Sequence, residues 1–308
     1  MLDPITPHLR AIDAINPMDQ AFEEAYMGGV TTAITGPGSA NVIGGMFVAL
    51  KTYGRRVDDM IIRNPIAMKI ALGENPKRVY KDQKKSPMTR MATAAMLRET
   101  LFRARTYMEK KEQAQEDISK MPEYDMRMEA LSMVLKREIP LKAHAHRADD
   151  IFTALRIAKE FDLDITLDHC TEGHIIADYL AEEGRDAIVG PTLANRSKIE
   201  LRNLTFDTPK ILHEAGVRIA ITTDSPVVPL HYLPLCAGLA HRSGLDEMEA
   251  LKAITINPAR IMGIDERVGS ISRGKDADIV VFNGNPIRDI DCTTHITIID
   301  GKIVYEHM

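Results

Sequence analysis

"IPLKAHAHRADDIFTALRIAKEFDLDITLDHC" (residues 139–170) joins two short apolar runs through a segment with a helical pattern. In the middle segment Ile151, Leu155 and Ala158 recur at helical spacing, which is typical of a helix with one apolar face. Both flanking runs are short and apolar, as expected of strands that are buried on both faces. The stretch therefore predicts a β-α-β unit, whose strands run parallel because a helix crosses between them.

The same plan recurs in other parts of the chain. A short apolar run followed by a polar turn occurs at residues 29–45, 67–76, 186–193 and 217–229. Strands that alternate with helices at this spacing predict a parallel sheet. After residue 264 the pattern changes to short strands separated by glycine, aspartate and asparagine turns, without helices between them. We therefore expect an α/β domain over residues 1–264 and a small β segment over residues 265–308.

Composition excludes several classes of protein. The net charge of −5 does not provide the basic surface that nucleic-acid-binding proteins need. No apolar run approaches the roughly 18 residues of a membrane span, and the N-terminus does not resemble a signal peptide. Cys170, Cys236 and Cys292 are too few and too scattered for a disulfide framework or a CxxC zinc site. We therefore expect a cytoplasmic protein that acts on a small molecule, as a monomer or a homo-oligomer.

Groups that suit catalysis lie at the ends of four predicted strands. They are Lys69, His144, His169 and Asp224. The carboxyl ends of parallel strands meet at one edge of a sheet, where reactive residues collect. Two imidazoles and a carboxylate suit a zinc-type ion with an open position for water. A single such histidine is more often a hydrogen-bonded core residue, but the joint pattern favours a metal site for His144, His169 and Asp224.

Three neighbouring residues leave alternatives open. His144 and His146 are two residues apart on a strand, so their side chains share one face. For His146, substrate contact and local hydrogen bonding are equally compatible with this position. Asp168 is expected to point away from the adjacent His169, on the opposite face.

Lys69 lies inside an apolar strand, where a bare ammonium is costly. It is therefore a carbamylated bridging ligand, an ion-pair partner, or a residue that extends to solvent.

With these residues in view, the chain resembles the amidohydrolase superfamily. It is most similar to the imidazolonepropionase-like and prolidase-like (Xaa-Pro or Xaa-Arg dipeptidase) branch. The resemblance implies a TIM-type (β/α)8 barrel with a small C-terminal β-sandwich segment. It rests on "HAH" (144–146), "DHCTEG" (168–173), "GVRIAITTDSPVVP" (216–229) and "ALKAITINPARIMGIDERVGSISRGKDADIVVFNGNP" (250–286).

The resemblance also implies roles for single residues. His144 and His169 correspond to metal ligands on the fifth and sixth barrel strands. Asp224 corresponds to an eighth-strand ligand that also takes the proton of the attacking water. Lys69 matches a strand that supplies a carboxylated bridging lysine in members with two metal ions, and His146 lies on the substrate side. The implied activity is hydrolysis of a carbon–nitrogen bond in an amide, cyclic amide or dipeptide, with one or two divalent ions, most often zinc.

One family feature has no counterpart in this sequence. The first barrel strand of these enzymes ends in His-x-His, and no such motif precedes residue 144. We therefore expect an N-terminally truncated barrel whose first strand is missing, with weak or absent metal binding. Two other functions stay open, namely an impaired relative that only binds a ligand or partner, and a deaminase of the same superfamily. Substrate identity, the number of metal ions, carboxylation of Lys69 and oligomeric state also stay open.

Overall fold

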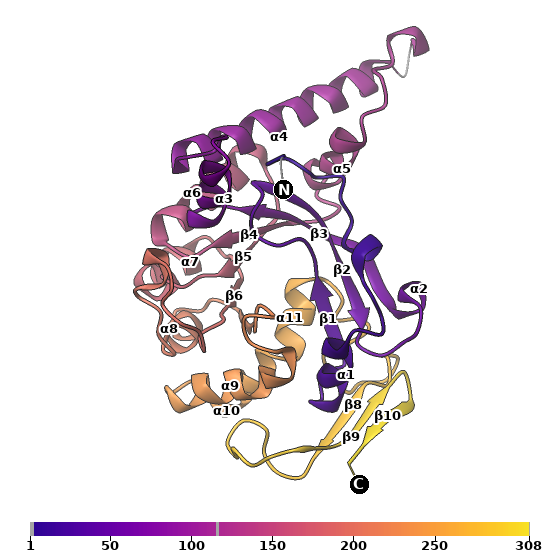
Figure 1. Cartoon of the computed structure of the whole chain (residues 1–308), viewed down its shortest axis with the longest axis vertical. Helices are drawn as coiled ribbons and strands as arrows, with labels where there is room; N and C mark the ends of the chain where they lie inside the picture. The colour runs from indigo at the N-terminus through magenta and orange to yellow at the C-terminus, as the bar shows by residue number, and fades with distance from the viewer. Residues whose placement is uncertain (1–2, 115–116, 308) are drawn as a thin grey trace.

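The computed structural model describes residues 3–114 and 117–307, and a curled seven-stranded sheet forms its centre (Figure 1). A separate three-stranded antiparallel sheet lies at the C-terminal end of the chain. The predicted α/β fold, with a barrel-type sheet and a small C-terminal β segment, is confirmed. The strands are β1 Thr32–Thr35, β2 Ile43–Lys51, β3 Ile61–Ala71, β4 Leu141–Ala145, β5 Ile165–His169, β6 Ala187–Val189, β7 Ile219–Ile221, β8 Ile279–Phe282, β9 Thr294–Ile299 and β10 Lys302–Glu306.

The large sheet is parallel only from β3 to β7. β1 pairs with β2, and β2 with β3, in antiparallel orientation. The prediction of a parallel sheet was therefore wrong for its N-terminal part. The physical reason is the length of the connections. Residues 52–60, with the short helix α2 Val57–Met60, cannot make the crossover of about a dozen residues that a parallel pair requires.

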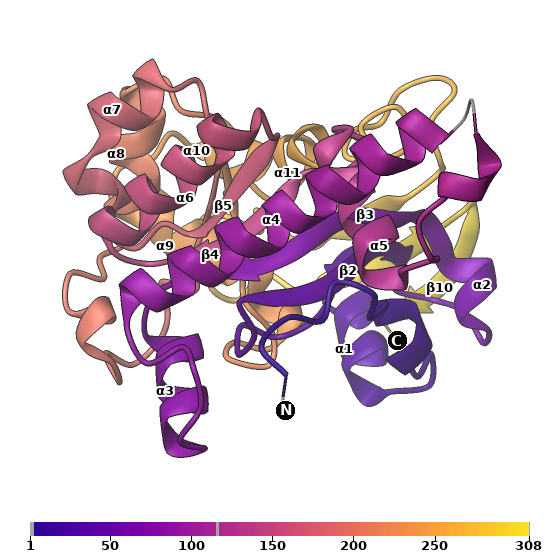
Figure 2. The ribbon, with the colours of Figure 1, turned by 90° about the horizontal axis from the view of Figure 1, so that it is seen from above.

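Helices cover the convex face of the large sheet. Figure 2 shows α4 and α6 lying across it near β4 and β5. Leu141, Ala143 and Ala145 of β4 belong to one apolar core together with residues of α4 and α6. The alternate residues of β4 therefore face the concave side of the sheet. Besides α2, the α-helices are α1 Gln20–Met27, α3 Glu74–Asp82, α4 Arg90–Gln113, α5 Met126–Leu135, α6 Ala148–Phe161, α7 Ala177–Glu182, α8 Thr208–Glu214, α9 Leu233–Arg242, α10 Glu247–Lys252 and α11 Ile256–Ile261.

Helix α11 packs on the concave side, between β6 and β1 in the view of Figure 1. Ala259 of α11 shares a second apolar core with Phe47 of β2 and Ala220 of β7. The side-chain amide of Asn257 donates to the carbonyl of Ile219 over 3.0 Å, which attaches α11 to β7. Part of the concave side is therefore filled by protein, and the polar residues that the sequence singled out occupy another part of it.

The C-terminal segment is joined to the rest of the chain by ion pairs and by a hydrogen bond. Lys51, the last residue of β2, is 3% exposed and lies 2.6 Å from Asp278 and 2.9 Å from Asp276. The hydroxyl of Thr297 in β9 donates to the carbonyl of Tyr26 in α1 over 2.7 Å. The division of the chain at residues 264 and 265 stays a prediction.

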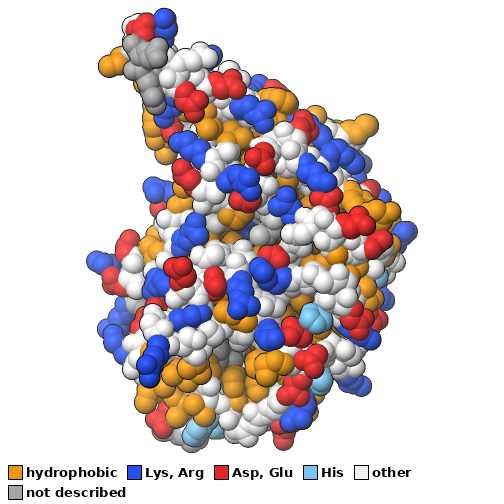
Figure 3. Space-filling view, turned by 180° about the vertical axis from the view of Figure 1, so that it is seen from behind, with side chains coloured by type: hydrophobic (Ala, Val, Ile, Leu, Met, Phe, Trp, Pro, Cys, Tyr) orange, Lys and Arg blue, Asp and Glu red, His pale blue; other side chains and the backbone are white. Residues whose placement is uncertain are grey.

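The surface charge and the helix lengths can be compared with those of nucleic-acid-binding and membrane-spanning proteins. On the face that Figure 3 shows, acidic and basic side chains of the described residues are interspersed. This differs from the single-sign patch that is typical of nucleic-acid binding. Within residues 3–114 and 117–307, no helix is both long and apolar enough to cross a bilayer.

Candidate metal centre

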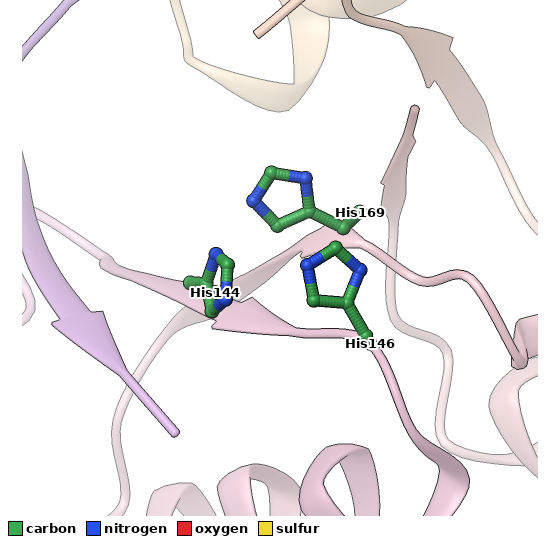
Figure 4. A group of neighbouring side chains, drawn as sticks. All are labelled: His144, His146 and His169. Carbon is green, nitrogen blue, oxygen red and sulfur yellow. The ribbon is translucent and has the colours of Figure 1, made fainter. Parts of the chain in front are cut away.

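Three histidines converge at the carboxyl ends of β4 and β5 (Figure 4). His144, His146 and His169 are 2%, 5% and 3% exposed. Their ring centroids are 4.4 to 4.7 Å apart, and one ring nitrogen of each lies within 4.8 Å of the others. The structure thus brings together the two histidines that were predicted as ligands. It also adds His146 to the same group of donor atoms.

The backbone at the end of β5 explains how His169 reaches this group. Lys142 and His144 lie two residues apart in β4 and so share its concave face. Asp168 accepts from the Lys142 ammonium over 2.6 Å, and the His169 ring contacts the His144 ring. Both neighbours therefore reach the same face, and the expectation that Asp168 points away was wrong. The φ angles of 74° at His169 and 45° at Cys170 break the alternation of an extended strand.

Hydrogen bonds leave one ring nitrogen of each histidine for a cation. Nδ1–H of His169 donates to the carbonyl of Gly190 over 2.7 Å, so Nε2 remains available. Nδ1 of His146 lies 2.8 Å from the hydroxyl of Thr171, which likewise leaves Nε2. Nδ1 of His144 is buried and has no hydrogen-bond partner among the described residues. An unpaired buried nitrogen beside two available ones is a donor set that fits a zinc-type ion.

Burial sets the charge of the three rings. Loss of water around the charged form lowers the pKa of His169 to about 3 and the pKa of His146 to about 2. The same cause, with repulsion from His169 second, lowers the pKa of His144 well below its usual range. All three imidazoles are therefore neutral near pH 7, and the neutral ring is the form that binds metals.

Two lysines and one aspartate lie beside the histidines. Lys69 and Lys142 are paired in register on β3 and β4. Their ammonium groups lie 3.5 Å and 2.6 Å from the Asp168 carboxylate and 5.6 Å and 5.7 Å from the Phe47 ring centroid. Lys69 is 5% exposed, which excludes the alternative in which it extends to solvent. Burial lowers the pKa of Lys69. It is an ion-pair partner in this structure, and its carboxylation stays a prediction.

Asp224 lies just after β7 and is not among the three residues whose donor atoms converge. Its φ angle is 49°, and the residue is exposed. Partial loss of water around the carboxyl raises the pKa of Asp224, while the Lys69 ammonium opposes the rise. The carboxylate is therefore within the electrostatic reach of the site. Its roles as a ligand and proton acceptor stay predictions.

Asn75 is a site residue that the sequence did not reveal. It follows the strand β3 in the first turn of α3, and its Nδ2 lies 3.2 Å from Nε2 of His144. The Lys198 ammonium donates to the Asn75 side-chain oxygen over 2.6 Å, so it is the NH2 group of the Asn75 amide that faces His144. Binding of a cation at Nδ1 would place the His144 proton on Nε2. The amide of Asn75 would then have to present its oxygen to the ring.

Glu200 is a second residue that the sequence did not reveal. It is completely buried in the short 3-10 helix η5 Ile199–Leu201. Its Oε1 lies 3.8 Å from Nε2 of His146, and its Oε2 accepts the backbone N–H of Glu74 over 2.9 Å. The stretch "RSKIE" (196–200) reads as an exposed charged loop, because no period distinguishes one inward-facing carboxylate within it.

Comparisons with known proteins agree with this geometry. The model of the amidohydrolase family matches residues 13–304. Amidohydrolase tasK of Hapsidospora irregularis is 30% identical, over 92% of this chain and 31% of that protein. Imidazolonepropionase of Geobacillus kaustophilus is 44% identical over 78 residues, which are 23% of this chain and 18% of that protein. The chain thus spans less than a third of the length of either relative.

One solved structure is similar along almost the whole chain. It is the crystal structure of an amidohydrolase from Thermotoga maritima, with 44% sequence identity and a TM-score of 0.97. The match covers 99% of this chain and 79% of that one. The same curled sheet and C-terminal segment therefore occur in an experimentally determined structure, and the resemblance inferred from the sequence motifs is confirmed.

Proposed function

The chain belongs to the amidohydrolase family, and from this premise we propose that it is a metal-dependent hydrolase of a carbon–nitrogen bond. The bond lies in an amide, a cyclic amide or a dipeptide. The observation that carries the proposal is the convergence of His144, His146 and His169. They are buried, neutral and close enough for one cation, at the edge of the sheet where parallel strands place reactive groups.

The proposed ligands of a zinc-type ion are His144, His169 and Asp224. His146 has the geometry of a third imidazole ligand, in addition to its expected place on the substrate side. Lys69 is the candidate bridging ligand where two ions bind. When bound, such a cation polarises a carbonyl and lowers the pKa of a water molecule from 15.7 to ~7.

The protein's own residues would position and move the proton. Asp224 would accept a proton from the attacking water and deliver it to the leaving nitrogen. This role is supported by the position of Asp224 shortly after β7, a strand parallel to its neighbour β6, because parallel strands have their carboxyl ends at one edge of the sheet. Gly190 holds the His169 ring through the hydrogen bond to Nδ1, and Thr171 does the same for His146. These contacts keep the ring nitrogens oriented without a rearrangement.

A direct test combines metal analysis with a substrate panel. We expect the purified chain to bind added zinc, because the donor atoms of three histidines converge in it. In excess zinc, we expect hydrolysis of at least one member of a panel of N-acyl amino acids, dipeptides and cyclic amides. An ammonia assay with aminated nucleobases separates a deaminase from a hydrolase. Absence of both zinc binding and turnover would refute the proposal.

A further inference from the structure

Three lysine ammonium groups lie around the histidines, and their pairing differs. Lys69 and Lys142 share the carboxylate of Asp168, which lies 2.6 Å from Lys142. Lys69 lies 3.5 Å from the same carboxylate. Lys198 pairs with a separate one. Its only carboxylate contact within the described residues is with Oε1 of Glu200, over 3.5 Å. The side chain of Lys198 is 22% exposed, against 6% for Lys69 and 10% for Lys142, so Lys198 is the site cation that a ligand can reach most readily.

Glu200 is held away from a closer contact with Lys198. The buried carboxylate uses Oε2 to accept the backbone N–H of Glu74, and its Oε1 makes no hydrogen bond among the described residues. Lys198 donates instead to the neutral side-chain oxygen of Asn75 over 2.6 Å. An ammonium has three N–H donors, and the one at Asn75 is the only one with a short hydrogen bond in the described structure.

Lys198 lies beside the histidine group. Asn75, which accepts from Lys198, also contacts His144, and Glu200 approaches His146. The side chain of Lys198 is 22% exposed, so the ammonium is largely removed from water but still reachable. It lies on the connection after β6, and such connections at the carboxyl ends of barrel strands set substrate specificity. A partly buried cation that a ligand can reach, and whose nearest carboxylate lies 3.5 Å away, favours an anionic ligand.

We propose that Lys198 binds a carboxylate of the substrate and makes the site selective for acids over neutral analogues. This inference rests on the proposed function, because it places the acid group beside the bond that is hydrolysed. Glu200 acts as a positioning residue that holds the ammonium at the edge of the site, and Asn75 contributes while its side-chain oxygen faces Lys198. The preferred substrates are then N-acyl amino acids or dipeptides with a free C-terminal carboxylate, rather than their amides or uncharged lactams.

Calorimetric binding in excess zinc tests this without requiring turnover. The probes are N-methanesulfonyl amino acids with varied side chains, each as the acid and as the carboxamide, because the sulfonamide resists hydrolysis. We expect the wild-type chain to bind at least one acid about tenfold or more tightly than its carboxamide, as a charge-assisted hydrogen bond implies. Lys198→Gln keeps a hydrogen-bonding group beside Asn75 and removes the charge. It should abolish the preference and leave carboxamide affinity unchanged.

Two further variants complete the test. Lys210→Gln is the matched control, because Lys210 lies at the surface and only approaches Glu214 over 3.8 Å. Lys198→Met provides a second loss of charge if Lys198→Gln does not fold. Equal binding of acid and carboxamide by the wild-type chain would overturn the proposal, as would failure of every acid to bind. If the Lys198 variants still bind the acid more tightly than the carboxamide and only their melting temperature falls, Lys198 has a structural role in its loop and does not bind the carboxylate.

Discussion

The side-chain amide of Asn75 lies 3.2 Å from Nε2 of His144, whose other ring nitrogen, Nδ1, has no hydrogen-bond partner among the described residues. The contact couples the orientation of one amide to the position of the histidine proton. It also links the histidine group to Lys198, because that ammonium binds the oxygen of the same amide. The first prediction follows from this coupling.

Asn75→Asp should tighten zinc binding by about tenfold. A carboxylate accepts both from Nε2–H of a metal-bound His144 and from Lys198, so no amide rotation is needed, and such carboxylates commonly tune metal affinity by 10- to 100-fold. Competition with a chromophoric chelator measures the affinity. Asn16→Asp adds the same charge at an exposed position and should have no effect. Weaker zinc binding by Asn75→Asp than by the wild-type chain would contradict the coupling.

Replacement of single histidines should show which of them are ligands. We expect His144→Ala, His146→Ala and His169→Ala each to weaken zinc binding by about 100-fold, because each removes one of three converging donors. The same chelator competition gives the values. His295→Ala, at an exposed position in β9, serves as the control. If His146→Ala binds zinc like the wild-type chain, His146 acts on the substrate side alone.

Asp224→Asn should remove turnover and preserve the fold. Proton transfer by a positioned group contributes about 10² to 10⁴ in rate, so kcat should fall by at least about 100-fold. The substrate is whichever member of the panel is hydrolysed. Circular dichroism should match the wild-type spectrum, because Asp224 is exposed and packs in no core. Retention of near-wild-type kcat would exclude Asp224 as the proton acceptor.

Lys51→Met should destabilise the chain by about 2 kcal/mol at pH 7, because Asp278 loses the charged hydrogen-bond donor 2.6 Å away, while Asp276 keeps Arg267 at 2.8 Å. Burial works to lower the pKa of Lys51, but hydrogen bonds to Asp278 and Asp276 outweigh it and raise that pKa above 10.5. Burial works to raise the pKa of Asp276, but the hydrogen bonds from Lys51 and Arg267 and the charges of both outweigh it together, so the pKa falls below 3.8. Urea unfolding gives the free energy of unfolding of both chains.

The difference in free energy of unfolding between the wild-type and Lys51→Met chains depends on pH, and the directions of the pKa shifts of Lys51 and Asp276 determine how. A depressed carboxylate pKa contributes stability above the unfolded value, here 3.8, which is lost as pH falls through the folded value. The raised pKa of Lys51 contributes stability below 10.5, lost only at higher pH. The gap between wild-type and Lys51→Met chains should therefore be constant near pH 7 and shrink below about pH 4. Lys302→Met, at an exposed position, should have the same free energy of unfolding as the wild-type chain.

The pattern of residues 139–170 predicted strand positions correctly, whereas the pattern of the N-terminal strands did not predict their direction. The β-α-β pattern of residues 139–170 placed His144 and His169 at the ends of neighbouring strands, and these ends adjoin in the structure. Period and strand order were sufficient for that inference, because parallel neighbours have their carboxyl ends at one edge. The antiparallel start of the sheet was missed, because an apolar run does not reveal the direction in which it pairs.

The sequence by itself determined the strand and helix periods, the family motifs and the histidines that lie at strand ends. Only the tertiary structure decided that Asp168 and His169 share a face, since a positive φ angle reverses one residue of a strand without a sequence period. It alone also placed Lys198 and Glu200 beside the histidines. Contacts between a loop and two strands distant in sequence depend on how the crossovers pack, and local pattern carries no information about that packing.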